Sequence, residues 1–220
     1  MALVIPHPPD DVAGEFAAAL PGFLGGEDGG GAIHEGYAGS PPQIPTWEEV
    51  SASGPLVHDP QQVFVLGLGA AMHRDIDAAG PAGWRLFAGN RQYKTVLGRM
   101  TRRRDLPGWK LAALHYGDPG AGRDRVWELL EASNQIPELP EIRSADYELR
   151  VLAVPALNLE AFWLHALSTS YAGLVAPFPA APNQPVPELN TARVYSMHEF
   201  LTKIAPLAER RNQSHPKSGS

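Results

Sequence analysis

The first 60 residues strongly limit what this chain can fold into, because they hold nine Pro and ten Gly. Ordering a Gly costs more backbone entropy than ordering any other residue, and Pro cannot donate a hydrogen bond to a sheet. A segment of this composition does not build a hydrophobic core of its own. It nevertheless carries spaced apolar side chains, namely Phe16, Leu20, Phe23, Ile33, Tyr37, Ile44 and Trp47. The sequence therefore predicts an extended arm over residues 1–60 that lies on its own domain or on a neighbouring subunit.

Charge is distributed unevenly along the chain. Residues 1–60 contain nine acidic side chains and no Lys or Arg, which gives a formal charge of −9. Residues 85–110 contain eight basic side chains and one acid, so that 8 − 1 gives +7. These local charges are hidden in a net charge of −6 for the whole chain. Oppositely charged segments of one chain either bind each other or attract other partners. The pattern therefore indicates an interaction surface and specifies no reaction.

The overall composition excludes several classes of protein. The chain has no Cys, which excludes disulfides, thiolate zinc sites and a cysteine nucleophile. A hydrophobic content of 44% with five Trp is enough for a real core and argues against global disorder. The N-terminus does not show the basic and apolar regions of a signal peptide, and no apolar run approaches the roughly 18 residues of a membrane span. These features predict a soluble cytoplasmic protein without a membrane segment.

Hydrophobic periodicity and capping signals predict a mixture of strands and helices. Strands are expected at 63–66, 84–88, 94–100, 109–116 and 147–154, the second and third forming a hairpin through Gly89–Asn90. Helices are expected at 10–20, stopped by Pro21; from the capping box Thr46–Glu49; at 118–133; at 159–167; and from the capping box Ser196–Glu199, ended or kinked at Pro206. The expected core residues are Phe64, Leu66, Leu86, Leu111, Leu130, Val151, Phe162 and Leu201.

Because these strands and helices mix without a regular βαβ alternation, the sequence predicts an α+β fold. The expected architecture is a single domain with a mainly antiparallel sheet, helices packed on one face and the extended Gly/Pro-rich N-terminal arm. The expected boundaries are an acidic arm with short helical pieces at 1–60, an α+β domain at 61–210 and a flexible tail at 211–220.

The basic segment is the first candidate binding site. Four arginines and two tryptophans form the predicted set: Arg99, Arg102, Arg103, Arg104, Trp84 and Trp109. Such a combination binds phosphate, nucleic acid or an acidic protein segment. The acidic total of the chain disfavours nucleic acid, and the −9 arm is itself a competing ligand. The favoured partner is therefore an acidic protein segment, including the arm of the same chain or of a second copy.

The loop His115–Asp118 is the candidate catalytic site, since it joins an expected strand to an expected helix N-terminus. In the alternative interpretation Asp118 caps the helix and Gly117 makes the turn. His165, on the expected apolar helix, is interpreted as a satisfied core histidine. The eight His residues show no pair with the spacing of a helical zinc site, and Gly67–Met72 lacks the third Gly of a dinucleotide-binding fingerprint. No cofactor or metal is expected.

The favoured hypothesis is a non-enzymatic interaction or assembly component that self-associates or binds another protein through the acidic arm and the basic hairpin. One alternative is a small hydrolase that uses His115 and Asp118. A second alternative is a phosphate- or nucleic-acid-binding module that uses Arg102–Arg104. The sequence leaves open whether the chain is an enzyme and which small molecule, if any, it binds.

Overall fold

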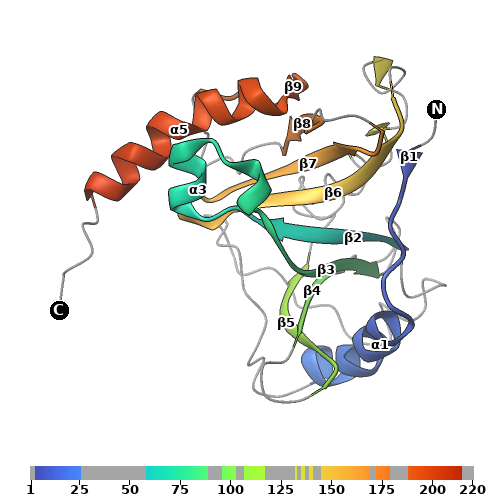
Figure 1. Cartoon of the computed structure of the whole chain (residues 1–220). Coiled ribbons are helices and arrows are strands. Elements are labelled where there is room, and N and C mark those ends of the chain that lie inside the picture. The colour runs from blue at the N-terminus through green and yellow to red at the C-terminus, as the bar shows by residue number, and fades with distance from the viewer. Residues whose placement is uncertain are drawn as a thin grey trace. The chain divides into compact units, whose positions relative to one another are not determined.

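The fold is given by a computed structural model (Figure 1). It describes residues 3–25, 58–88, 96–102, 107–116, 132, 135–136, 139–140, 145–168, 172–178 and 188–214. In this part of the chain nine strands form a sheet in the order β5-β4-β3-β2-β6-β7-β8-β9, with β1 paired to β6 outside this path. The sheet is mostly antiparallel and is accompanied by three α-helices, which confirms the predicted α+β fold.

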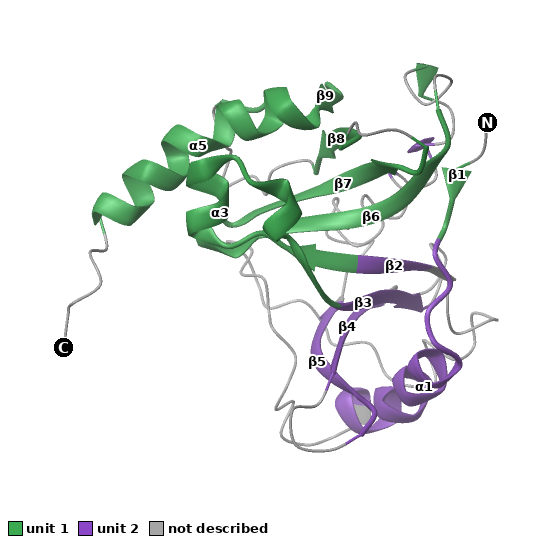
Figure 2. Cartoon of the chain, in the orientation of Figure 1, with its two compact units in different colours: residues 1–5, 63–82, 137–220 green, residues 6–62, 83–136 purple. Residues whose placement is uncertain are grey.

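The chain divides into two compact units (Figure 2). Unit 1 comprises residues 1–5, 63–82 and 137–220, and unit 2 comprises residues 6–62 and 83–136. Two strands, β2 (His58–Val65) and β3 (Gly80–Ala88), contribute residues to both units. The predicted strands in these two segments are confirmed, although both begin earlier than the apolar run alone indicated.

In unit 2, β3 pairs with β4 (Val96–Arg102), and β4 pairs with β5 (Trp109–Tyr116), both antiparallel. The predicted hairpin of the second and third strands is therefore confirmed, with Leu86 opposite Gly98 in register. Its turn at Gly89–Asn90 lies outside the described residues. A register shift between Arg99 and Met100 marks a β-bulge in the β4–β5 pair. A bulge of this kind increases the local twist of the strands.

The helix α1 (Asp10–Gly25) packs on one face of these three strands. The buried residues of α1 recur every fourth position and so form one stripe: Val12, Phe16, Leu20 and Leu24. They join a cluster with strand residues that include Leu86, Met100 and Leu114. The first part of the predicted arm is therefore docked on its own chain. The prediction that Pro21 stops this helix is wrong, and burial of Leu24 one turn later offsets part of the lost hydrogen bond.

In unit 1, the strands β6 (Tyr147–Val154), β7 (Leu159–Ala166), β8 (Leu174–Pro177) and β9 (Tyr195–Ser196) pair in sequence as an antiparallel ladder. The two-residue strand β1 (Leu3–Val4) pairs with β6 in parallel. The unit also contains the 3-10 turns Ile76–Ala78 and Pro155–Leu157. The predicted strand at 147–154 is confirmed.

The prediction of a helix at 159–167 is wrong, because residues 159–166 form the strand β7. This strand lies between β6 and β8, and its residues are buried on both faces of the sheet. A strand of this kind has a nearly continuous apolar sequence rather than an alternating one, so its period does not separate it from a buried helix. The reversal before β7 uses Asn158 in the left-handed conformation, with φ of 50°.

Two helices cover one face of the unit 1 strands (Figure 1). They are α3 (Leu68–His73) and the C-terminal α5 (Met197–Ser214). Ser196 caps α5, since its Oγ accepts a hydrogen bond of 3.1 Å from the backbone N–H of Glu199, which confirms the predicted start of this helix. The helix continues past Pro206 to Ser214, so Pro206 does not end it.

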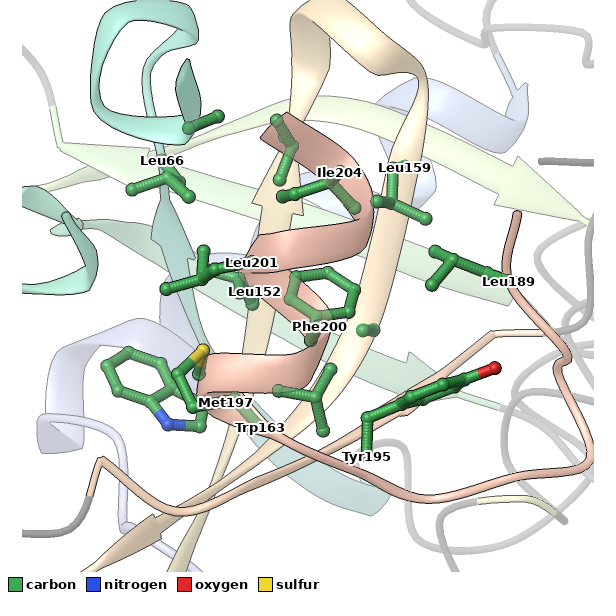
Figure 3. Close-up of a cluster of buried hydrophobic side chains, with 14 of the residues drawn as sticks. Leu66, Leu152, Leu159, Trp163, Leu189, Tyr195, Met197, Phe200, Leu201 and Ile204 are labelled. Carbon is green, nitrogen blue, oxygen red and sulfur yellow. The ribbon is translucent and has the colours of Figure 1, made fainter. Parts of the chain in front are cut away.

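The core of unit 1 lies beneath these helices (Figure 3). The buried stripe of α5 consists of Met197, Phe200, Leu201, Ile204, Ala205 and Ala208. All of these residues except Ala205 pack in one cluster with Leu152 of β6 and Trp163 of β7. Of the eight predicted core residues, seven are buried, and Leu130 lies outside the described residues.

Candidate functional site

Of the six residues of the predicted basic site, the structure describes Arg99 and Arg102 of β4 together with Trp84 and Trp109. Arg103 and Arg104 lie outside the described residues. The structure adds Arg85 and Lys110 to the same three strands, and β3, β4 and β5 contain no Asp or Glu. We keep the name basic hairpin for the predicted β3–β4 hairpin together with its neighbour β5, whose described cations include Arg99, Arg102 and Lys110. Four of the eight basic residues of the segment 85–110 thus lie on neighbouring strands of one ladder.

Strand alternation distributes the predicted residues over both faces of the ladder. Trp84 lies opposite Met100 and is buried in the cluster beneath α1, so it is not available to a ligand. Arg99 lies opposite Arg85, one position away from Gly98, whose backbone is in contact with Phe16 of α1. Arg99 therefore points to the face opposite α1. The sequence placed Arg99 and Trp84 in one site, whereas the structure places them on opposite faces.

Two cations of the basic hairpin are unpaired within the described part of the chain. Arg99 is half-buried and Lys110 is exposed, and neither forms an ion pair there. Lys110 lies opposite Thr101, and strand alternation puts Thr101 on the same face as Arg99. Diagonal neighbours on a sheet lie roughly 7–8 Å apart, which is within the reach of long side chains. The two cations can therefore converge on one anionic group.

Arg102 is exposed at the end of β4, opposite Trp109. Its guanidinium carbon lies 5.7 Å from the centroid of the Trp109 ring, in the range of a cation–π contact. Trp109 itself is half-buried and packs against the cluster beneath α1. Of the predicted tryptophans, Trp109 alone thus remains close to a described arginine at the surface.

The acids of α1 do not meet these cations. Asp10, Asp11 and Glu15 are exposed, and none of them forms an ion pair with a described residue. The docking of α1 rests instead on its buried apolar stripe. The prediction that Phe16 anchors this part of the arm is confirmed, and α1 contacts the strands through apolar side chains.

The candidate catalytic loop is described only at its start. His115 is a half-buried residue of β5 that lies opposite Leu97. Asp118 lies outside the described residues. The catalytic role of this pair stays a prediction.

A second polar cluster in unit 1 was not predicted. Arg150 of β6 lies with its guanidinium carbon 4.5 Å from the ring centroid of Phe64 and 5.1 Å from that of Trp163. Its Nε donates a hydrogen bond of 2.5 Å to Glu148 Oε1. The Trp163 ring is held by a hydrogen bond of 2.8 Å from its Nε1 to the carbonyl oxygen of Ala172. The ion pair is thus fixed on two aromatic rings at the surface of the sheet.

His165 completes this cluster. It lies opposite Glu148 in register, and its ring meets the Trp163 ring edge-on at 5.1 Å. Its Nδ1 is buried and has no hydrogen-bond partner among the described residues, so the interpretation of a satisfied core histidine is wrong. Burial lowers the pKa of His165, the charge of Arg150 lowers it further, and Glu148 opposes the shift. The imidazole is therefore neutral at pH 7.

The sequence contained only an indirect signal of this cluster. Glu148 and Arg150 alternate with apolar residues in β6, which placed them on one face of a strand. Their neighbours Trp163 and His165 were assigned to a helix, so the cross-strand pairs could not be recognised. Register is a property of the folded sheet, and it brings these four residues together.

Two kinds of site are absent from the part of the chain that the structure describes. No group of three or more His, Asp or Glu residues there could hold a metal ion. No helix among these residues is long and apolar enough to cross a membrane.

The arrangement offers cationic and aromatic contact surfaces and, in the described residues, no assembled set of nucleophile, base and oxyanion donor. Comparison with known proteins adds no functional information, since no family model, no curated protein and no solved structure matches the chain.

Proposed function

We propose that the chain is a non-enzymatic protein-interaction component that binds an acidic protein segment on the basic hairpin. The observation that carries this proposal is the composition of β3, β4 and β5, which hold four Lys or Arg and no acid. Arg99 and Lys110 share a face and have no ion-pair partner among the described residues. Like charges on adjacent strands repel each other, and an anionic ligand relieves that repulsion.

A protein partner fits this surface better than a nucleic acid. The chain has a net charge of −6, which repels a long polyanion outside the local contact. A short acidic segment needs only two or three cations and avoids that repulsion. Arg102 stacks beside Trp109 on the α1 face, so it adds positive charge at the end of β4 rather than a contact on the face of Arg99 and Lys110.

The test measures binding of a fluorescent peptide of about ten glutamates by anisotropy, at low salt and near 0.15 M salt, where the Debye length is about 8 Å. The hairpin variant combines Arg99→Gln, Arg102→Gln and Lys110→Gln. The matched control combines Arg193→Gln, Lys203→Gln and Arg210→Gln, which changes the net charge equally at exposed or half-buried positions of unit 1. We expect the hairpin variant to bind about tenfold more weakly or worse, and the control to bind nearly as well as the unmodified protein.

Three outcomes contradict the proposal. Equal losses in both variants would show that only net charge attracts the peptide. Tighter binding of a single-stranded oligonucleotide of the same length would favour the phosphate-binding alternative. No binding at low salt would remove the basic hairpin as a site. Melting temperatures check that the variants are folded, since exposed charges contribute about 0–1 kcal/mol per pair.

A further inference from the structure

The helix-covered face of unit 1 continues beyond the helices as a partly exposed strip. Along β6, Leu152 is fully buried, while the side chains of Arg150 and Glu148 are 16% and 20% exposed. Along β7, Trp163 is buried, His165 is half-buried and Leu167, just after the strand, is 49% exposed. The strip defined by Glu148, Arg150, His165, Leu167 and Val4 therefore leads from the core to the surface.

Exposed hydrophobic side chains converge at this end of the sheet. The large hydrophobic residues that are exposed in the described part of the chain are Val4, Ile5 and Leu167. Val4 of β1 lies opposite Glu148, and Glu148 lies opposite His165, so the three share one face. The backbone N–H of Leu167 donates a hydrogen bond to the carbonyl oxygen of Asp146, just before β6. Clustered exposed apolar residues with polar neighbours mark protein contact sites, whereas single ones need no explanation.

The charges of the strip are self-complementary. Glu148 and Arg150 stand two residues apart on the same face and carry opposite charges. When two copies meet about a two-fold axis, the arginine of each copy faces the carboxylate of the other. Arg150 uses its Nε for Glu148 within its own chain, and no described residue accepts a hydrogen bond from its two Nη groups. With respect to the described part of the chain, these groups are therefore still able to donate to a second carboxylate.

We propose that this strip is a contact surface between two copies of the chain, with Arg150 and Glu148 at its centre and Val4 and Leu167 at its apolar flanks. The stacking of Arg150 on Phe64 and Trp163 holds the guanidinium in place before contact, which lowers the entropy cost of association. Arginine and tryptophan are also enriched among residues that dominate binding energy. This inference is independent of the basic hairpin and of its proposed ligand.

The first test is the concentration dependence of the solution mass of the full chain, measured by sedimentation velocity. We expect a monomer–dimer equilibrium in the micromolar range, and we expect Val4→Glu or Leu167→Glu to weaken it about tenfold or more. Ile5→Glu is the matched control, because Ile5 is 40% exposed like Val4 but follows the end of β1 and has no partner residue in the register with β6. A protein that stays monomeric up to about 1 mM would overturn the proposal.

The second test exchanges the central charges. Arg150→Glu makes the strip carry two acids, and Glu148→Arg makes it carry two bases, so neither variant should associate with itself. A mixture of the two should recover dimers of one copy of each, because their strips are then complementary. A purely structural role of the ion pair predicts no recovery on mixing, since each variant still lacks its internal pair.

Circular dichroism establishes whether each charge variant folds. If either variant is unfolded, the apolar series decides the question. Equal dimerisation of Val4→Glu, Leu167→Glu and Ile5→Glu would refute the strip as the interface.

Discussion

Phe16 of α1 lies against Gly98 of β4, in the space that a side chain on this strand residue would occupy. A methyl group added at Gly98 would lie 2.8 Å from Phe16 Cδ2 and 2.9 Å from Cζ, and closer still to Cε2. Phe16 is fully buried there, between Val12 and Leu20 of the same helix stripe. A helix in the Gly-rich N-terminal region and a glycine more than eighty residues later thus form one contact. This contact, together with the rest of the apolar stripe, holds α1 on the strands of unit 2.

Replacing Gly98 with Ala should destabilise unit 2. The added methyl group overlaps with the ring of Phe16, and either the ring or α1 has to shift. Overpacking of this kind costs about 1–3 kcal/mol of unfolding free energy. The measurement is urea denaturation of the full chain, followed by tryptophan fluorescence.

Gly14→Ala provides the matched control for this prediction. Gly14 lies on the exposed side of the same helix, and a methyl group there meets nothing within 4 Å. Ala is favoured over Gly in a helix by about 0.5–1 kcal/mol, so this variant should be slightly more stable. A Gly98→Ala variant as stable as the Gly14→Ala variant would show that α1 does not press on β4.

Ser196→Ala should weaken the start of α5. The Ser196 Oγ accepts the N–H of Glu199 at 3.1 Å, and without it this N–H loses its partner at the helix N-terminus. The expected loss is about 1 kcal/mol of unfolding free energy, measured by thermal or urea unfolding.

Ser196→Asp keeps an acceptor at the same position and should retain most of the stability. Thr202→Ala removes a hydroxyl that bonds the carbonyl oxygen of His198 within the helix, and it should have a smaller effect. Equal losses for Ser196→Ala and Thr202→Ala would argue against the cap.

The strands that were found from the sequence are those with clear local signals. The β3–β4 hairpin and β5 each combine an apolar run with Gly or Pro at the ends, and β6 alternates. β7 was missed because its sequence, Leu159–Ala166, is apolar on both faces, and only its neighbours β6 and β8 show that it is a strand. The capping box before α5 was found because a cap is a local interaction between Ser196 and Glu199.

For the candidate sites too, features that depend on neighbouring residues in the sequence could be predicted, and features that depend on strand pairing could not. The basic character of 85–110 was visible in the sequence, but the assignment of Trp84 to the core and Arg99 to the other face depended on strand register. The cluster of Arg150, Trp163 and His165 depends on pairing across two strands, and no spacing along the chain encodes it.

Phe162→Ala should strongly destabilise unit 1, although Phe162 belongs to a strand rather than to the helix first expected. Its side chain is buried, and its ring meets that of Phe178 edge-on with centroids 4.5 Å apart. Truncation of a buried Phe costs about 3–5 kcal/mol, because apolar contacts are lost and a cavity remains. Urea denaturation measures this loss.

Leu167→Ala is the control for this substitution. Leu167 is 49% exposed, so its truncation should lower the unfolding free energy only slightly. The double variant Phe162→Ala, Phe178→Ala should lose less unfolding free energy than the two single variants together. Each single variant already removes the ring contact, which contributes about 0.5–1.5 kcal/mol. Strictly additive losses would show that the two rings do not interact.

Acidification should destabilise the protein through His165. Its pKa in the folded protein lies below the ordinary value of 6.5, because burial and then the positive charge of Arg150 disfavour the imidazolium, against the opposing effect of Glu148. The unfolded chain therefore binds a proton more readily than the folded chain. The stability due to neutral His165 is complete above pH 6.5 and is lost as the pH falls from there through the folded pKa.

The measurement compares the unfolding free energy of the unmodified protein and of His165→Gln between about pH 7.5 and about pH 5.5, on either side of the ordinary histidine pKa. Gln cannot take up a proton, so the variant should lose less stability over this range. All other titrating groups are common to the two proteins and cancel in the difference. Because Arg150 contributes to the lowered pKa, Arg150→Gln should also reduce the pH dependence while leaving the imidazole in place. If the unmodified protein and His165→Gln lose stability in parallel, His165 is not the group whose protonation destabilises the fold.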